Sequence, residues 1–169
     1  MIQELHPRVA GETLTIRPIQ IDDLEMQRDF IRGLSPAAKR FRFFGGVSEL
    51  PSPELRRLCD VDGKYSMAFV ATVIRNGREV EIGVARYAPY AGSNTREMAV
   101  TVADEWQHRG LGTTLVKHLI ETAKLNRVTQ LFSVALVDND AMAALAKDLG
   151  MASMRDPSDP RQVIYSLAV

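Results

Sequence analysis

Residues 96–123 read REMAVTVADEWQHRGLGTTLVKHLIETA and carry most of the information about the fold. A strand-like segment is followed, after a polar stretch, by apolar residues at helical spacing, beginning at Leu111 and Leu115. Gly110 and Gly112 stand where this helix is expected to begin. A glycine lets a bulky group approach the backbone, and the first amides of a helix attract anions. The stretch therefore predicts either a simple turn or a site for an anion such as a pyrophosphate.

Two common phosphate-binding loops do not fit this stretch. A P-loop requires G-x-x-x-x-G-K-[ST], which occurs nowhere in the chain. A dinucleotide-binding fold requires G-x-G-x-x-G directly after a strand, but here Leu115 occupies the third glycine position and the polar residues DEWQHR come first. What remains is the pattern Q-H-R-G-L-G-T between a strand and a helix.

The chain as a whole has the size and composition of one ordinary globular domain. Its 169 residues suffice for one core, so we expect a single domain over residues 1–169, with residues 1–12 as an N-terminal extension. The net charge of zero gives no reason to expect a nucleic-acid partner. No apolar run approaches the ~20 residues that cross a bilayer, so we expect no membrane partner. The single cysteine, Cys59, cannot form an internal disulfide, which suits a cytoplasmic protein.

Local signals along the chain predict a mixed α/β fold. Ser35 before Pro36 begins a helix, Asn76 and Gly77 form a hairpin turn, and Asp138 or Asn139 caps the last helix. We expect strands within residues 14–19, 65–74, 79–87, 96–102, 131–137, 151–154 and 162–169, and helices within residues 21–34, 35–44, 51–59, 110–124 and 139–149. Because strands and helices do not alternate regularly in this order, we predict a mixed sheet.

Two motifs in the second half of the chain point to a known family. Gln107, Gly110 and Gly112 meet the pattern [QR]-x-x-G-x-[GA], and residues 139–151 are similar to N-x-x-[AM]-x-x-L-x-x-x-x-G-[FM]. In this order, the motifs resemble those of the GCN5-related N-acetyltransferases (GNAT). The resemblance implies the GNAT acyl-CoA N-acyltransferase fold, a central and mostly antiparallel sheet with a splayed parallel strand pair, flanked by helices. Residues 14–46 and the loop DPSDP at 156–160 resemble the bacterial protein-lysine acetyltransferase branch.

The resemblance also implies a cosubstrate, acetyl-CoA, and the residues that bind it. In the family, the pantetheine arm lies between the splayed strands and pairs with the strand before the glycines, which corresponds here to Val100, Thr101 and Val102. The pyrophosphate binds the amides at the start of the helix. The residues implied around that turn are Gln107, His108, Arg109, Gly110, Leu111, Gly112 and Thr113. Asn139 is implied near the cofactor arm, although it also reads as a plain helix cap.

Acetyl transfer to an amine needs a base, because an amine is protonated at neutral pH. The similar lysine acetyltransferases use a strand glutamate for this purpose, and Glu97 matches its position. The alternative is a surface glutamate or one that is ion-paired with Arg96. Many family members carry a tyrosine seven residues after the asparagine as a general acid, but Ala146 stands there in this chain.

Three functions remain open at this level. The first is an acetyl-CoA-dependent N-acetyltransferase acting on a protein lysine, the second acts on a small-molecule amine, and the third is a non-catalytic acyl-CoA-binding sensor. The amine acceptor is the expected partner, and the protein is expected to be a monomer or a homodimer. We expect no metal, because no Cys/His cluster has metal-ligand spacing. Near the signature, Trp106 is expected to pack in the core or at its rim, and His118 is expected to be solvated.

Overall fold

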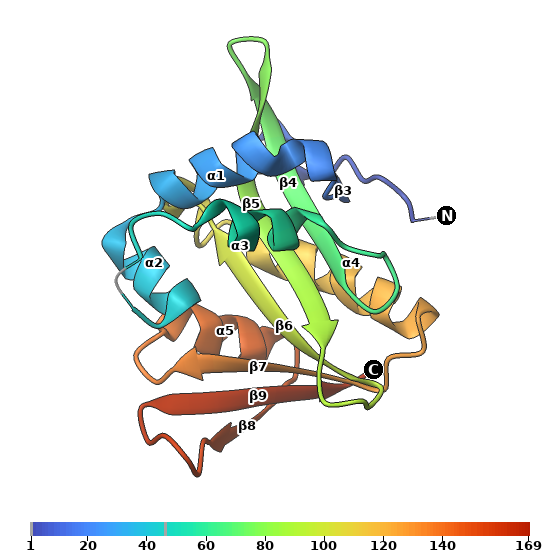
Figure 1. Ribbon diagram of the computed structural model, residues 1–169, viewed down its shortest axis with the longest axis vertical. Helices are drawn as coiled ribbons and strands as arrows, with labels where there is room; N and C mark the ends of the chain where they lie inside the picture. The colour runs from blue at the N-terminus through green and yellow to red at the C-terminus, as the bar shows by residue number, and fades with distance from the viewer. Residues whose placement is uncertain (1, 46) are drawn as a thin grey trace.

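The computed structural model describes residues 2–45 and 47–169. Its helices are the 3₁₀ helices η1 (Ile21–Asp23) and η2 (Asp104–Trp106) and the α-helices α1 (Leu24–Gly33), α2 (Pro36–Phe43), α3 (Ser52–Cys59), α4 (Leu111–Leu125) and α5 (Asp140–Asp148). Its strands are β1 (Arg8–Val9), β2 (Glu12–Thr13), β3 (Thr15–Pro18), β4 (Met67–Arg75), β5 (Arg78–Pro89), β6 (Thr95–Val102), β7 (Gln130–Leu136), β8 (Ala152–Arg155) and β9 (Gln162–Ala168). Figure 1 shows α1, α2 and α3 in front of the central sheet and α4 behind it. The predicted mixed α/β fold is confirmed.

Among the described residues, seven strands form the central sheet in the order β3-β4-β5-β6-β7-β9-β8. Neighbouring strands are antiparallel except for β6 and β7, which are parallel. A parallel pair requires a crossover connection, and α4 supplies it. Within the described ranges, none of the helices combines the length and the apolar character that crossing a bilayer requires.

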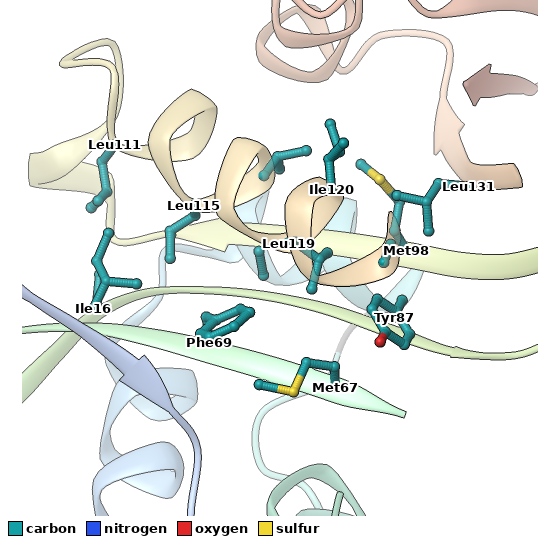
Figure 2. Packing of buried hydrophobic residues seen from close by; sticks show 14 of the residues in the cluster. Ile16, Met67, Phe69, Tyr87, Met98, Leu111, Leu115, Leu119, Ile120 and Leu131 are labelled. Atoms are coloured by element: carbon teal, nitrogen blue, oxygen red, sulfur yellow. The ribbon is translucent and has the colours of Figure 1, made fainter. Parts of the chain in front are cut away.

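One face of α4 is buried against the sheet. Leu111, Leu115 and Leu119 are each at most 1% exposed, and Figure 2 shows Leu115 and Leu119 pointing toward Phe69 on β4. Gly83 on β5 permits this close approach, because a Cβ atom there would lie 3.1 Å from Leu115 Cδ1. Each buried leucine contributes roughly 1.5–3 kcal/mol. The packing therefore fixes the first turn of α4 beside the end of β6.

The opposite face of the sheet carries a second apolar cluster. Phe30 and Ile31 of α1 and Leu55 of α3 pack there against Val70 and Val84 of the sheet. This cluster and the α4 cluster lie on opposite faces, as expected for a sheet covered by helices on both sides.

A β-bulge separates two stretches of β5. The register with β4 shifts between Ala71 and Thr72, so that Gly83 pairs with Ala71 while Glu81 pairs with Thr72. Bulges change which face a side chain points to. Ile82 belongs to the α4 cluster, so Glu81 points to the face covered by α1.

Several local features differ from the sequence-based expectation. Residues 8–13 form a small hairpin of β1 and β2, and Val9 is buried in the α4 cluster. His118 was expected to be solvated, which is wrong, because its ring lies 4.2 Å from the ring of Phe69. Burial of the His118 ring lowers the pKa of His118.

Trp106 is 2% exposed, so its expected place in the core is confirmed.

Candidate active site

The parallel strands β6 and β7 separate along their length. Their register runs through three pairs and ends at Glu97 and Phe132, and among the described residues no further pair joins them. Both strands nevertheless continue, β6 to Val102 and β7 to Leu136. Beyond Glu97, the edge of β6 that faces β7 and the edge of β7 that faces β6 are therefore not paired with each other. A cavity of about 450 Å³ lies there, with walls from α2, β6, β7, α4 and α5.

The glycine turn closes one end of this cavity. Gly110 is the N-cap of α4 with φ of +83°, and His108 also has a positive φ of +59°. The first intrahelical bond runs from the Thr114 amide to the Gly110 carbonyl oxygen, at 3.0 Å. The amides of Leu111, Gly112 and Thr113 precede it, and such amides have no acceptor within a helix. The helix N-terminus is therefore available to an anion in the cavity.

The turn requires glycine at position 110 but not at position 112. Gly110 is needed by the turn itself, because side chains are disfavoured at its positive φ. Gly112 is not in that region, and a Cβ atom there would lie 3.7 Å from Val102 Cγ2 and 4.0 Å from Leu145 Cδ2, which are ordinary contacts. The fold does not require glycine at position 112, although Gly112 lines the cavity.

Some of the other residues of the turn line the cavity, and others do not. Gln107, His108 and Thr113 line the cavity. The Gln107 side-chain amide donates a hydrogen bond of 3.1 Å to the Val102 carbonyl oxygen, which ties the turn to the end of β6. Arg109 and Leu111 do not line it: the Arg109 guanidinium lies 5.5 Å from the centre of the Trp106 ring, and Leu111 is buried in the core.

The residues implied on β6 and at α5 all line the cavity. Val100 and Val102 pack partly against the α4 cluster, so only part of each faces the cavity. Thr101 is buried, and its hydroxyl has no hydrogen-bond partner among the described residues. The Asn139 Oδ1 accepts a hydrogen bond of 3.0 Å from the Met142 amide. Helix capping at Asn139 and a place in the cavity wall therefore coexist.

Glu97 lies on β6 at the last paired position, where the strands begin to separate. Its side chain is exposed and lines the cavity. Arg96 is not its partner, because adjacent strand residues point to opposite faces and the Arg96 guanidinium instead donates to the carbonyls of Ser93 and Thr95.

Arg42 is a charged residue of the site that the motifs did not single out. It comes from α2 and lines the cavity near Glu97. Burial lowers the pKa of the Arg42 guanidinium, and the opposite charge of Glu97 counteracts this shift. Residue 42 lies far from residue 97 in the sequence, so only the folded arrangement brings the two charges together.

Position 146 lies away from the cavity. Ala146 is 2% exposed and belongs to the α4 cluster, whereas Ala141, Ala144 and Leu145 form the α5 wall. Along the described part of the cavity wall there is no tyrosine. Cys59 lies elsewhere, as the last residue of α3 in the second apolar cluster, where burial raises the pKa of its thiol to about 11 and suppresses reactivity. The described residues contain no group of three side chains placed to hold a metal ion.

This arrangement suits an extended ligand with an anionic group at one end. Free strand edges can hydrogen-bond to amide groups of a ligand, and the helix N-terminus can bind a phosphate. A volume of about 450 Å³ falls in the range of small-molecule and cofactor sites.

Comparison with known proteins agrees with this geometry. Residues 37–151 match the model of the acetyltransferase (GNAT) family. Acetyltransferase PA5475 of Pseudomonas aeruginosa is 43% identical over 159 residues, which cover 94% of this chain and 86% of that protein. Acetyltransferase Pat of Mycolicibacterium smegmatis is 29% identical over 148 residues, or 87% of this chain and 44% of that protein.

Solved structures show the same fold. The GNAT domain of S. lividans PAT superposes with a TM-score of 0.89 at 24% identity, covering 98% of this chain and 97% of that one. The family model spans more than half of the present chain, and the Pseudomonas relative covers nearly all of it. The chain therefore belongs to the GNAT family and is an acetyltransferase.

Proposed function

We propose that the protein transfers an acetyl group from acetyl-CoA directly to an amine, and that the acceptor is a lysine side chain of a protein. The observation that carries this proposal is the separation of β6 from β7 at Glu97, beside a cavity that ends at the N-terminus of α4. Glu97, at the separation of the strands, is a candidate base, and the N-terminus of α4 is an anion site. The same cavity connects the two.

The cosubstrate is assigned to the backbone of the cavity walls. The stretch of β6 from Val100 through Thr101 to Val102 has an edge that β7 leaves unpaired, and the free backbone groups on that edge receive the pantetheine amides. The amides around Gly112 receive the pyrophosphate, and Asn139 lies across the cavity from β6 on the α5 side. Bound acetyl-CoA supplies the activated acetyl group.

Glu97 acts as the base in this proposal. Its carboxylate takes a proton from the acceptor ammonium, directly or through a water, so that the amine becomes nucleophilic. Arg42 lines the same cavity, and its charge lies near enough to interact with that of Glu97. No tyrosine lines the described wall, so we infer that the departing thiolate takes its proton from water.

The exposure of Glu97 supports a macromolecular acceptor. Small-molecule sites usually enclose most of the ligand, whereas Glu97 lines the cavity and is also exposed, so that a lysine on another protein can reach it. The likeness to acetyltransferase Pat and to the GNAT domain of S. lividans PAT supports the same choice. A small amine remains the second candidate acceptor.

The Glu97→Gln variant tests the base. We expect its kcat for acetyl transfer to fall about 100-fold or more, because a positioned general base contributes that much. Acetyl-CoA affinity, measured by calorimetry, should stay within about twofold, because the carboxylate acts on the acceptor. The control is Glu121→Gln, an exposed residue paired with Lys124 on α4. A Glu97→Gln variant with the wild-type rate would refute the assigned role.

The acceptor is tested by comparing kcat/KM for lysine-containing proteins and peptides with kcat/KM for free alkylamines. We expect the protein and peptide acceptors to be favoured by about tenfold or more, since only they extend over the surface around the cavity. A preference for free amines would move the assignment to the small-molecule class and leave the base assignment intact.

A further inference from the structure

Arg42 on α2 is partly buried, and its guanidinium has no partner among the described residues. Within that part of the chain, no oxygen accepts a hydrogen bond from it and no carboxylate forms an ion pair with it. Arg40, two residues earlier on the same helix, instead donates to the Asp138 carboxylate at 2.9 and 3.4 Å. A guanidinium that is partly withdrawn from water gains from pairing with an anion. Arg42 is therefore free to bind an anionic ligand.

The nitrogens of Arg42 can be reached from the candidate active site. Arg42 lines that cavity. Among the described residues, the side-chain atoms that are fully buried without a partner include Arg96 Nε and both carboxylate oxygens of Glu81, but none of the Arg42 nitrogens. A ligand in the cavity can therefore meet the guanidinium.

Arg42 and Glu97 face the same part of the cavity. Glu97, Ala99 and Thr101 alternate along β6 with residues that pack against the α4 cluster, so they point to the opposite face of the sheet. Figure 1 shows α2, which carries Arg42, on that side of the sheet. The charge of Glu97 acts on Arg42, although no hydrogen bond joins the two described side chains. The cavity thus presents a carboxylate and a guanidinium that are near each other but not bonded.

A second guanidinium makes the surroundings of Arg42 favourable for an anion. Arg86 on β5 lines a small space beside Arg42 and Thr101. Burial, followed by the positive charge of Arg42, lowers the pKa of Arg86 to about 10. Arg86 itself donates to the Leu58 carbonyl and to Gln27, so its own hydrogen bonds are made within the protein. Because two like charges repel, an anion bound at Arg42 relieves the repulsion.

We propose that Arg42 recognises a carboxylate of the acceptor protein, supplied by an aspartate or glutamate close to the acetylated lysine. This inference rests on the proposed function. Such an acceptor matches both charges of the site, because its ammonium group faces Glu97 while its carboxylate pairs with the guanidinium. Arginine binds a carboxylate through two parallel hydrogen bonds, which also fixes the orientation of the acceptor. Phe41 and Phe44 of the cavity wall cover the carbon chain of the lysine.

The other source of an anion at Arg42 is the acyl group itself, as in a succinyl thioester. In the complex with acyl-CoA alone, that carboxylate would lie beside Glu97 with no ammonium group to offset the two negative charges. An acidic acceptor brings its ammonium group and its carboxylate together. The charges of the site therefore favour the acceptor as the source.

The experiment measures acetylation of alanine pentapeptides that have blocked, uncharged termini and a central lysine. One glutamate is placed in turn at each of the other positions, and each peptide has a match with glutamine instead. For the wild type, we expect kcat/KM for at least one glutamate peptide to exceed that for its match by about tenfold or more, because hydrogen bonds between charged groups contribute that much.

Variants of α2 connect this preference to Arg42. Arg42→Gln should abolish the preference, whereas Arg42→Lys keeps the charge and should keep part of it. The ratio is taken within each variant, so a change in folding or at Glu97 affects both peptides of a pair alike. Arg40→Gln is the matched control, since Arg40 lies on the same helix but does not line the cavity, and it should keep the full preference.

The inference is overturned if the wild type does not distinguish the paired peptides, or if Arg42→Gln retains the preference. It is also overturned if Arg42→Lys or Arg40→Gln loses the preference as fully as Arg42→Gln does. If the peptides are not distinguished and Arg42→Gln instead loses succinyl transfer from succinyl-CoA selectively, the anion belongs to the acyl group.

A binding measurement separates this inference from the proposed function. If the wild type acetylates none of the peptides, the proposed function fails, and calorimetry of the same peptides with the CoA-loaded protein decides the inference. Tighter binding of a glutamate peptide by about tenfold or more, lost in Arg42→Gln, would support recognition by Arg42. Equal binding of the paired peptides would overturn it.

Discussion

Gly112 lies in the first turn of α4, in the wall of the cavity, with room beside it for a Cβ atom. We expect Gly112→Ala to bind acetyl-CoA and to raise the free energy of unfolding by about 0.5–1 kcal/mol, because alanine is favoured over glycine within a helix. Gly112→Leu should remain folded but lose acetyl-CoA affinity about tenfold or more, because its longer side chain enters the space next to the helix amides. Calorimetry and thermal unfolding measure both effects.

The pair of variants separates a turn from a ligand site. If Gly112→Leu bound acetyl-CoA as wild type does, the pyrophosphate would not lie against this turn. If Gly112→Ala were destabilised, the glycine would serve the fold after all, contrary to the contacts found around it.

At the scale of secondary structure elements, the connection from β6 to α4 shapes the site. The hydrogen bond from Gln107 to the Val102 carbonyl holds this connection against the strand. We expect Gln107→Leu to reduce the free energy of unfolding by about 1 kcal/mol, the usual contribution of one hydrogen bond. We also expect a several-fold weaker affinity for acetyl-CoA, because the helix amides lose their fixed position.

Urea unfolding and calorimetry on the same samples measure these two effects. The control is Gln130→Leu, at the start of β7, whose side chain is exposed. An affinity loss of equal size in the control would show that the position of the turn does not matter.

Elements with local signals were predictable from the sequence. Ser35 accepts from the Ala38 amide as the cap of α2, Asn76 and Gly77 both have positive φ, and Asn139 caps α5. Each signal acts within four residues, so it is visible in the chain itself. The separation of β6 and β7 was implied by the family resemblance, and the register confirms it.

Features that depend on distant partners were not predictable. The bulge that turns Glu81 inward arises from the pairing of β5 with β4, and the apolar pattern of β5 alone does not reveal it. Arg42 approaches Glu97 only when α2 packs near β6. His118 was mistaken for a solvated residue because its position on α4 does not reveal the Phe69 ring that covers it. The roles of Glu97 and the glycine turn stay predictions until the variants are measured.

At the scale of the whole molecule, one ion network joins three separate segments. Arg17 of β3 donates to Asp23 of η1 at 2.8 Å and to Glu79 of β5 at 2.9 Å, and the Arg17 side chain is 15% exposed. Burial alone would raise the pKa of Asp23, but the hydrogen bonds from Arg17 and the Gln20 amide lower it. The hydrogen bonds from Arg17 likewise lower the pKa of Glu79.

Folded-state pKa values below the unfolded values mean that this network stabilises the protein above about pH 4 and loses its effect as the pH falls further. We expect Arg17→Met to cost about 2–4 kcal/mol at pH 7, since it leaves two partly buried carboxylates unpaired. The cost should shrink toward pH 3, when these groups are protonated.

Denaturant unfolding across this pH range provides the measurement. Arg75→Met is the control, because its pair with Glu12 is exposed and should contribute less than about 1 kcal/mol. Equal costs for the two variants, or a cost for Arg17→Met that does not change with pH, would contradict the assigned role of the network.

The order of the strands also bears on how the protein behaves at high concentration. The long apolar strand β4 lies inside the sheet, whereas the edge strands β3 and β8 have only four residues each and β3 ends in Pro18. Exposed strand edges are where molecules add to one another and begin to aggregate, and short edges with proline hinder this. The apolar, β-branched segment MAFVATVIR at 67–75 has the composition of segments that form fibrils, and it is kept from contact with other copies as long as the sheet stays intact.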